Sequence, residues 1–204
     1  GAWNAEGIVL FAPNTQGPLF RVAASGGQAV AVTTRNPQPH YRHPSFLPDG
    51  RQFVFFEFGS ADSSGIYLGS LDSGETTLLT AGDSRGFYLS PGPRGVEASR
   101  EGGWLLWLRG QALVAQRLDL ERKALTGDPI TLADPVGADN TGAMAASVSA
   151  GGLVAYRAGR ADPRQLTWFD RTGKAAGVAG APDPELLNGP ELSPDGRRIA
   201  LDRT

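Results

Sequence analysis

Two histidines, His40 and His43, stand close together in the stretch HYRH and are the only histidines of the chain. On a helix this spacing would bring both imidazoles to one metal ion. Pro39 and Pro44 flank the stretch, however, and a residue that precedes proline avoids helical backbone angles. No carboxylate lies nearby in the sequence, so we expect neither a metal site nor another cofactor. We predict instead that Arg42 and His43 contact a ligand, at the start of a strand beside exposed loops.

Serine and carboxylate side chains are the other candidate catalytic groups. Ser147 and Ser149 lack the glycine that precedes the nucleophile in a Gly-x-Ser-x-Gly turn. A carboxylate pair could hydrolyse glycosides, and Glu57 and Asp202, at the ends of apolar runs, are the candidates for it. The remaining candidates stand in or beside glycine turns, a role that accounts for them without catalysis: Asp49, Asp72, Asp170 and Asp195. We therefore expect that the chain is not an enzyme.

The charge pattern limits the classes of partner that the chain can bind. The 204 residues include 19 basic and 21 acidic ones, in no long block of one sign, so we expect no nucleic-acid partner. The absence of Cys excludes disulfides and a thiol nucleophile. No apolar run approaches the roughly 18 residues of a membrane helix, so we expect no direct membrane insertion by this segment. Because the chain begins with Gly1, we expect a piece of a longer protein whose targeting segment lies outside it.

The elements that must position these residues repeat along the chain. An apolar strand that leads into a polar turn recurs roughly every 50 residues, a period typical of repeat folds; its copies begin at Leu19, Ile66, Leu113 and Leu166. A second apolar run stands ahead of each copy, and a fifth run, RRIALDR, stands alone near the C-terminus. Alternating apolar and polar residues indicate strands. Only 119–128 shows any helical pattern, and it falls where a hairpin turn is expected.

A Pro-Asp-Gly turn precedes two of these strands, in HPSFLPDGRQFVFF (43–56) and GPELSPDGRRIALD (189–202). Asp hydrogen-bonds its own backbone and Gly adopts positive φ, so both residues favour a tight hairpin turn. The predicted turn residues are Pro48, Asp49, Gly50, Pro194, Asp195 and Gly196.

Four strands per repeat predict an all-β fold, namely a β-propeller or propeller fragment of about 4–5 four-stranded blades. A β-sandwich is the alternative. We expect a single domain over 1–204, with blades near 1–36, 37–82, 83–136 and 137–183 and an incomplete one at 184–204. The first copy should lack its first strand, because GAWNAE is too short, and the last should stop after its second. Incomplete repeats leave strand edges unpaired, so we expect a homo-oligomer in which the incomplete repeats of different chains pair with each other.

These motifs, together with GIYLGSLDSGE and QLTWFDRTGK, resemble the WD40-like, or TolB-like, β-propeller repeat family. More narrowly, their order is similar to that of the propeller that follows the kinase domain and membrane helix of certain bacterial serine/threonine kinases. The resemblance extends from about Gly7 to Thr204 and departs at LSPGPRGVEASREGG (89–103), where a longer loop replaces the turn.

The resemblance implies a non-catalytic module that binds a protein, a peptide or a small ligand, as an extracytoplasmic (periplasmic) sensor or scaffold of a bacterial signalling protein. It supplies no catalytic residues. Two alternatives stay open: the substrate-gating propeller of a prolyl-oligopeptidase-type serine peptidase, and a carbohydrate-active propeller enzyme. The fold alone does not choose among these functions.

Overall fold

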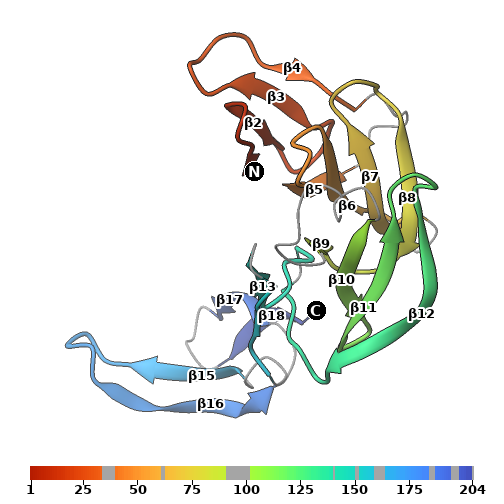
Figure 1. The fold of residues 1–204 in the computed structure, drawn as a ribbon. Coiled ribbons are helices and arrows are strands. Elements are labelled where there is room, and N and C mark those ends of the chain that lie inside the picture. Colours follow the sequence, from red (N-terminus) through yellow and green to blue (C-terminus); the bar gives the residue numbers. More distant parts are fainter. Residues whose placement is uncertain are drawn as a thin grey trace. The chain divides into compact units, whose positions relative to one another are not determined.

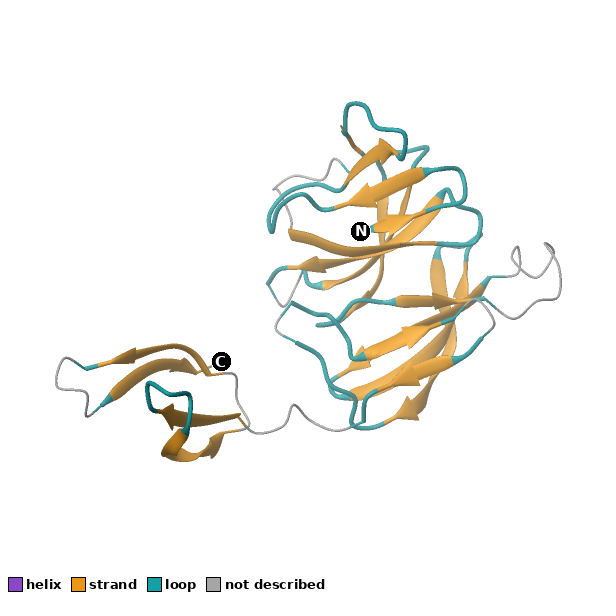
Figure 2. Ribbon diagram, turned by 90° about the vertical axis from the view of Figure 1, so that its left-hand side faces the viewer, coloured by secondary structure: helices purple, strands orange, loops and turns teal. Residues whose placement is uncertain are grey.

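A computed structural model describes residues 1–33, 40–60, 63–90, 102–139, 141–149, 152–158, 164–183, 187–193 and 198–203. The chain divides into two units, Gly1–Ala158 and Gly159–Thr204. All regular structure in the described ranges is β-strand (Figure 2), which confirms the all-β prediction. The described residues accordingly include no helix long and apolar enough to cross a membrane.

The first sheet of unit 1 has four antiparallel strands in the order of the chain. They are β1 (Ala2–Trp3), β2 (Ile8–Phe11), β3 (Phe20–Ala23) and β4 (Val30–Ala31). The prediction that this repeat lacks its first strand was wrong, because Ala2 pairs with Leu10 and Trp3 with Val9. The Asn4 side chain stabilises the following turn, since its Oδ1 accepts a hydrogen bond from the Ile8 amide at 2.8 Å.

The second sheet contains the first Pro-Asp-Gly hairpin and again runs in chain order. Its strands are β5 (His40–Phe46), β6 (Gln52–Phe58), β7 (Gly65–Ser70) and β8 (Thr76–Ala81). From Phe53 to Glu57 every residue of β6 is buried, so both faces of this strand are covered. The run QFVFFEF therefore forms an inner strand, as its aromatic and branched residues predict.

The third sheet follows with the same order. It consists of β9 (Phe87–Leu89), β10 (Gly103–Arg109), β11 (Ala112–Asp119) and β12 (Ala124–Ala133). Residues 119–124 form the hairpin turn between β11 and β12, as predicted, and the Arg122 amide donates to Asp119 Oδ1 at 2.9 Å. Figure 1 shows β5 and β9 on one side of unit 1 and β8 and β12 on the other.

The expected repeat at 137–183 is divided between the units. In unit 1, β13 (Ala146–Val148) pairs with β14 (Val154–Tyr156) as a two-stranded sheet. In unit 2, β15 (Arg164–Phe169) pairs with β16 (Ala175–Asp183), and β17 (Leu187–Leu192) pairs with β18 (Ile199–Arg203). The sheets are thus four-stranded up to β12, and the later described strands pair as two-stranded hairpins.

Face-to-face contact between successive sheets builds the core of unit 1. Because side chains alternate along a strand, Phe53 and Phe55 of β6 pack toward the first sheet, while Val54 packs toward the third. A third cluster joins the far face of the third sheet to Val136, Met144 and the β13–β14 hairpin. No described cluster joins that hairpin back to the first sheet, so each sheet shares its faces only with its neighbours in the chain.

The tryptophans of unit 1 differ sharply in burial. Trp107 of β10 belongs to the cluster between the second and third sheets and is 4% exposed. Trp3 of β1 is 69% exposed. The clusters between the sheets therefore enclose Trp107, whereas Trp3 on the first strand of the chain is left in solvent.

Candidate functional site

A β-bulge re-aims the side chain of His43. Arg42 pairs with Phe56 and Ser45 with Val54, so His43 and Pro44 together oppose one residue of β6. His43 adopts a φ of 51°, an uncommon backbone conformation for a residue with a side chain. Bulges and such backbone outliers occur preferentially at functional sites, where they redirect a side chain.

His43 is held by the loop that precedes β13. Its Nε2 donates to the carbonyl oxygen of Thr141 at 3.1 Å. Burial lowers the pKa of His43, the hydrogen bond to Thr141 raises it, and the positive charges of Arg85 and Arg42 lower it further, leaving it below its usual value. At neutral pH the imidazole is therefore mostly uncharged and acts as an anchor for the loop.

Arg42 lies on an aromatic side chain of the neighbouring strand. Its guanidinium carbon is 4.8 Å from the ring centroid of Phe58, within the range of a cation–π contact. The Phe58 ring also stacks with His40 and is 40% exposed. Among the described residues, Arg42 has no carboxylate partner, so its N–H groups are not used in an ion pair.

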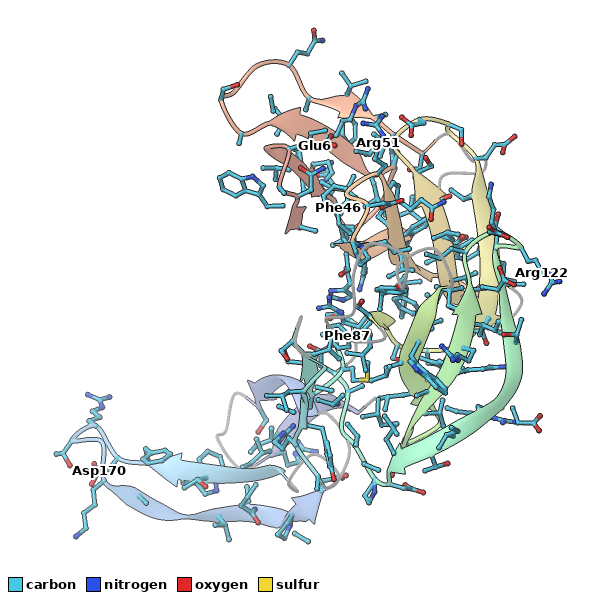
Figure 3. All side chains as sticks on the ribbon, viewed as in Figure 1. Glu6, Phe46, Arg51, Phe87, Arg122 and Asp170 are labelled. Atoms are coloured by element: carbon cyan, nitrogen blue, oxygen red, sulfur yellow. The ribbon has the colours of Figure 1, made fainter. Side chains whose placement is uncertain are left out.

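Arg85 repeats this arrangement from the connection between β8 and β9. Its guanidinium carbon is 4.3 Å from the ring centroid of Phe87, the first residue of β9 (Figure 3). Arg85 Nε is buried and has no hydrogen-bond partner in the described part of the chain. Burial lowers the pKa of Arg85 but leaves the guanidinium positively charged. A buried donor without an acceptor is rare in folded proteins and calls for an explanation.

The loop around Asp139 completes this region. Asp139 Oδ1 accepts hydrogen bonds from the amides of Thr141 and Ala143 and from the Thr141 hydroxyl. Burial raises the pKa of Asp139, but these hydrogen bonds and the nearby His43 outweigh it, so the carboxyl stays below its usual pKa. The Arg85 amide donates to the Gly142 carbonyl at 2.8 Å. The carboxylate therefore stabilises its own turn and, among the described residues, forms no ion pair with an arginine.

We call Arg42, His43, Arg85 and Asp139, with the rings of Phe58 and Phe87, the arginine site. The structure brings both sequence-predicted contact residues, Arg42 and His43, into it. Arg85 was not predicted from the sequence to contact a ligand, because in AGDSRGF it resembles an ordinary turn residue. The signal that could have found it is an arginine two positions before an aromatic residue that opens a strand.

The predicted turn residues lie outside the arginine site. Pro48, Asp49 and Gly50 connect β5 to β6, and Asp49 Oδ1 accepts hydrogen bonds from the amides of Arg51 and Gln52. Asn4 donates to the Gly50 carbonyl at 2.7 Å, which ties the turn to the first sheet. The second predicted turn, Pro194, Asp195 and Gly196, lies outside the described residues.

An ion-pair network also surrounds the first of these turns. Arg51 pairs with Asp72 of the β7–β8 turn and with Glu6 of the first sheet, and Figure 3 shows Glu6 and Arg51 side by side. The hydrogen bonds that Arg51 donates to Asp72 raise the pKa of Arg51. These groups are exposed and paired with one another, so the turn serves to join sheets.

A Gly-x-Ser-x-Gly frame does occur at 82–86, although Ser147 and Ser149 lack it. A nucleophile in this frame needs an exposed hydroxyl on a strand-to-helix turn. Ser84 is 1% exposed, its Oγ accepts a hydrogen bond from the Leu108 amide at 3.0 Å, and a strand follows it. The hydroxyl of Ser84 thus satisfies a buried amide of the third sheet.

The carboxylate candidates fall in different units. Glu57 is a buried residue of β6 that pairs across the sheet with Tyr41, and Asp202 lies on β18. Among the described residues, no three His, Cys, Asp or Glu side chains gather as metal ligands would. Of the candidate residues, those of the arginine site have the clearest chemistry, which is recognition of an anion.

A comparison with models of known protein families finds no match to this chain, and a comparison with curated proteins finds none either.

Proposed function

We propose that the chain is a non-catalytic β-propeller module that binds a protein or peptide through the arginine site. Two observations support the propeller: four-stranded sheets recur in chain order, and sheets that follow one another in the chain pack face to face. This is how blades pack in a propeller. The proposal extends to a sensor or scaffold role in a bacterial signalling protein, with the module outside the cytoplasm.

One observation carries the binding proposal. Arg42 and Arg85 each pack on an aromatic ring and, in the described part of the chain, keep their guanidinium groups free of ion pairs. A surface arginine without a ligand gains little from such an arrangement, whereas arginine and aromatic side chains dominate binding hot spots.

A random peptide display library tests the proposal. The whole chain is immobilised, and enriched peptides are re-measured against Arg42→Glu, with Arg122→Glu as control. We expect selected peptides to bind the wild type and the control and to lose binding to Arg42→Glu. Peptides that bind all three proteins equally would contradict binding at this site, and cleavage of bound peptides, detected by mass spectrometry, would contradict the non-catalytic role.

A further inference from the structure

We propose that the arginine site recognises a carboxylate of an acidic peptide segment, with Arg42 and Arg85 as its two donors. The inference rests on the proposed function and specifies the ligand chemistry. It starts from Arg85 Nε, which is buried and has no acceptor in the described residues. A carboxylate that approaches the side of the guanidinium accepts hydrogen bonds from Nε and from a terminal nitrogen at once. The ligand then supplies the acceptor that the described part of the chain does not.

The aromatic rings hold both guanidinium groups in place before the ligand arrives. The guanidinium carbon of Arg42 lies over the ring of Phe58, and that of Arg85 lies over the ring of Phe87. A guanidinium held over a ring offers the N–H groups of its own plane to a planar carboxylate. Because less side-chain freedom is lost on binding, such preorganisation increases affinity.

The charge balance favours a carboxylate over a phosphate. Arg42 and Arg85 contribute two positive charges, and the carboxylate of Asp139 offsets one of them. His43 contributes little charge at neutral pH, because burial disfavours its protonated form. The net charge of about one matches a single carboxylate, whereas a phosphomonoester carries about −1.5 to −2.

The exposed ring of Phe58 favours a peptide over a free anion. It lies beside Arg42, is 40% exposed, and stacks with the ring of His40. A peptide places apolar atoms of neighbouring residues next to its acidic side chain and can cover this ring, which a small dicarboxylate cannot. We therefore expect both charge and apolar contact to contribute to affinity.

Isothermal titration calorimetry of the whole chain tests the inference with three probes. The first is a short peptide with acetylated and amidated ends and central glutamates, the second replaces each glutamate by glutamine, and the third is free succinate. We expect the glutamate peptide to bind most tightly. Arg42→Gln and Arg85→Gln should each weaken it about tenfold or more, the effect of losing a charge-assisted hydrogen bond. Arg122→Gln, on the exposed β11–β12 turn (Figure 3), should leave affinity unchanged.

Each other outcome overturns the inference in a distinct way. Equal binding of the glutamate and glutamine peptides would exclude carboxylate recognition while leaving the proposed peptide-binding function intact. Succinate that binds as tightly as the peptide would make the ligand a small dicarboxylate. No binding by any probe would reject the inference, and the display library would then decide the proposed function by itself. If Arg85→Gln lowers the unfolding temperature markedly, the affinity of Arg42→Gln decides the inference. Arg42 contacts the partly exposed ring of Phe58, so its replacement should disturb the fold less.

Discussion

At the scale of single residues, His43 shows how one backbone outlier organises a site. The bulge in β5 gives its imidazole access to the Thr141 carbonyl, so that a strand residue anchors a loop nearly a hundred positions later in the chain. Arg42, its immediate neighbour, stays paired with Phe56 in the regular ladder and reaches the ring of Phe58. One irregular residue therefore lets adjacent side chains differ in role: His43 anchors a loop, and Arg42 stays available for the binding that we propose.

Burial of His43 predicts that stability depends on pH. Its pKa lies below 6.5 in the folded chain, chiefly because of burial, and near 6.5 in the unfolded chain. Between these two values the unfolded state binds more protons, so the unfolding free energy contributed by His43 is present above about pH 6.5 and falls as pH decreases through the folded pKa. His43→Asn, which tolerates positive φ and does not titrate, should flatten this decline.

Urea unfolding at about pH 7.5, 6.5 and 5.5 measures the effect, with His40→Asn as the matched control. We expect the control to show the same decrease of unfolding free energy with falling pH as the wild type. If His43→Asn showed that same decrease too, His43 would not be the group responsible.

At the scale of elements, the loop before β13 is as important as the strands. Gly142 has a φ of 77°, and a Cβ at this position would lie 2.6 Å from an edge carbon of the Phe56 ring. The loop can thus reach His43 and Arg85 only because it packs its backbone directly on β6. Any side chain at Gly142 would push the loop away from the arginine site.

Gly142→Ala should therefore destabilise the chain more than the same change at Gly110. Both glycines have positive φ, which costs a residue with a side chain about 1–2 kcal/mol. A Cβ at Gly110 meets no atom of the described residues within 4 Å, whereas at Gly142 the clash with Phe56 adds about 1–3 kcal/mol. Denaturant unfolding of both variants gives the difference. Equal losses would mean that the loop does not pack on Phe56 in solution.

The strands were largely predictable and the site only partly so. QFVFFEF became β6, and the Pro-Asp-Gly stretch at Asp49 became a hairpin turn, because local alternation and turn chemistry determine both. β1 escaped prediction since two residues carry no periodic pattern; it exists because Asn4 fixes the adjoining turn. Arg85 could not be recognised as a site residue, because its role depends on contacts with Phe87 and with a loop distant in the sequence.

At the scale of the whole molecule, the two units differ in the interactions that stabilise each of them internally. Every fully buried apolar side chain in the described residues belongs to unit 1, from Leu10 to Met144. In unit 2 the ring of Phe169 is 63% exposed, and Asp170 at the β15–β16 turn (Figure 3) accepts hydrogen bonds from Thr172 and Lys174. Local turn hydrogen bonds are thus the best-defined interactions of its hairpins.

A shortened chain of residues 1–158 should therefore unfold at nearly the temperature of the whole chain. All three apolar clusters lie within it, so we expect a midpoint within about 3 °C, the shift that ~1 kcal/mol produces in a domain of this size. Thermal unfolding followed by circular dichroism compares the two chains. A much lower midpoint, or none, would instead agree with the single domain predicted from the sequence.

Because the tryptophans differ in burial, the intrinsic fluorescence of the chain reports on its folded structure. Trp107 is enclosed between the second and third sheets, while Trp3 stands in solvent. A soluble quencher such as iodide reaches the exposed indoles of Trp3 and Trp168 more readily than those of Trp107 and the half-buried Trp104, so the residual emission comes chiefly from the third sheet of unit 1. Separation of these two sheets would then appear as a red shift and renewed quenching, without any attached dye.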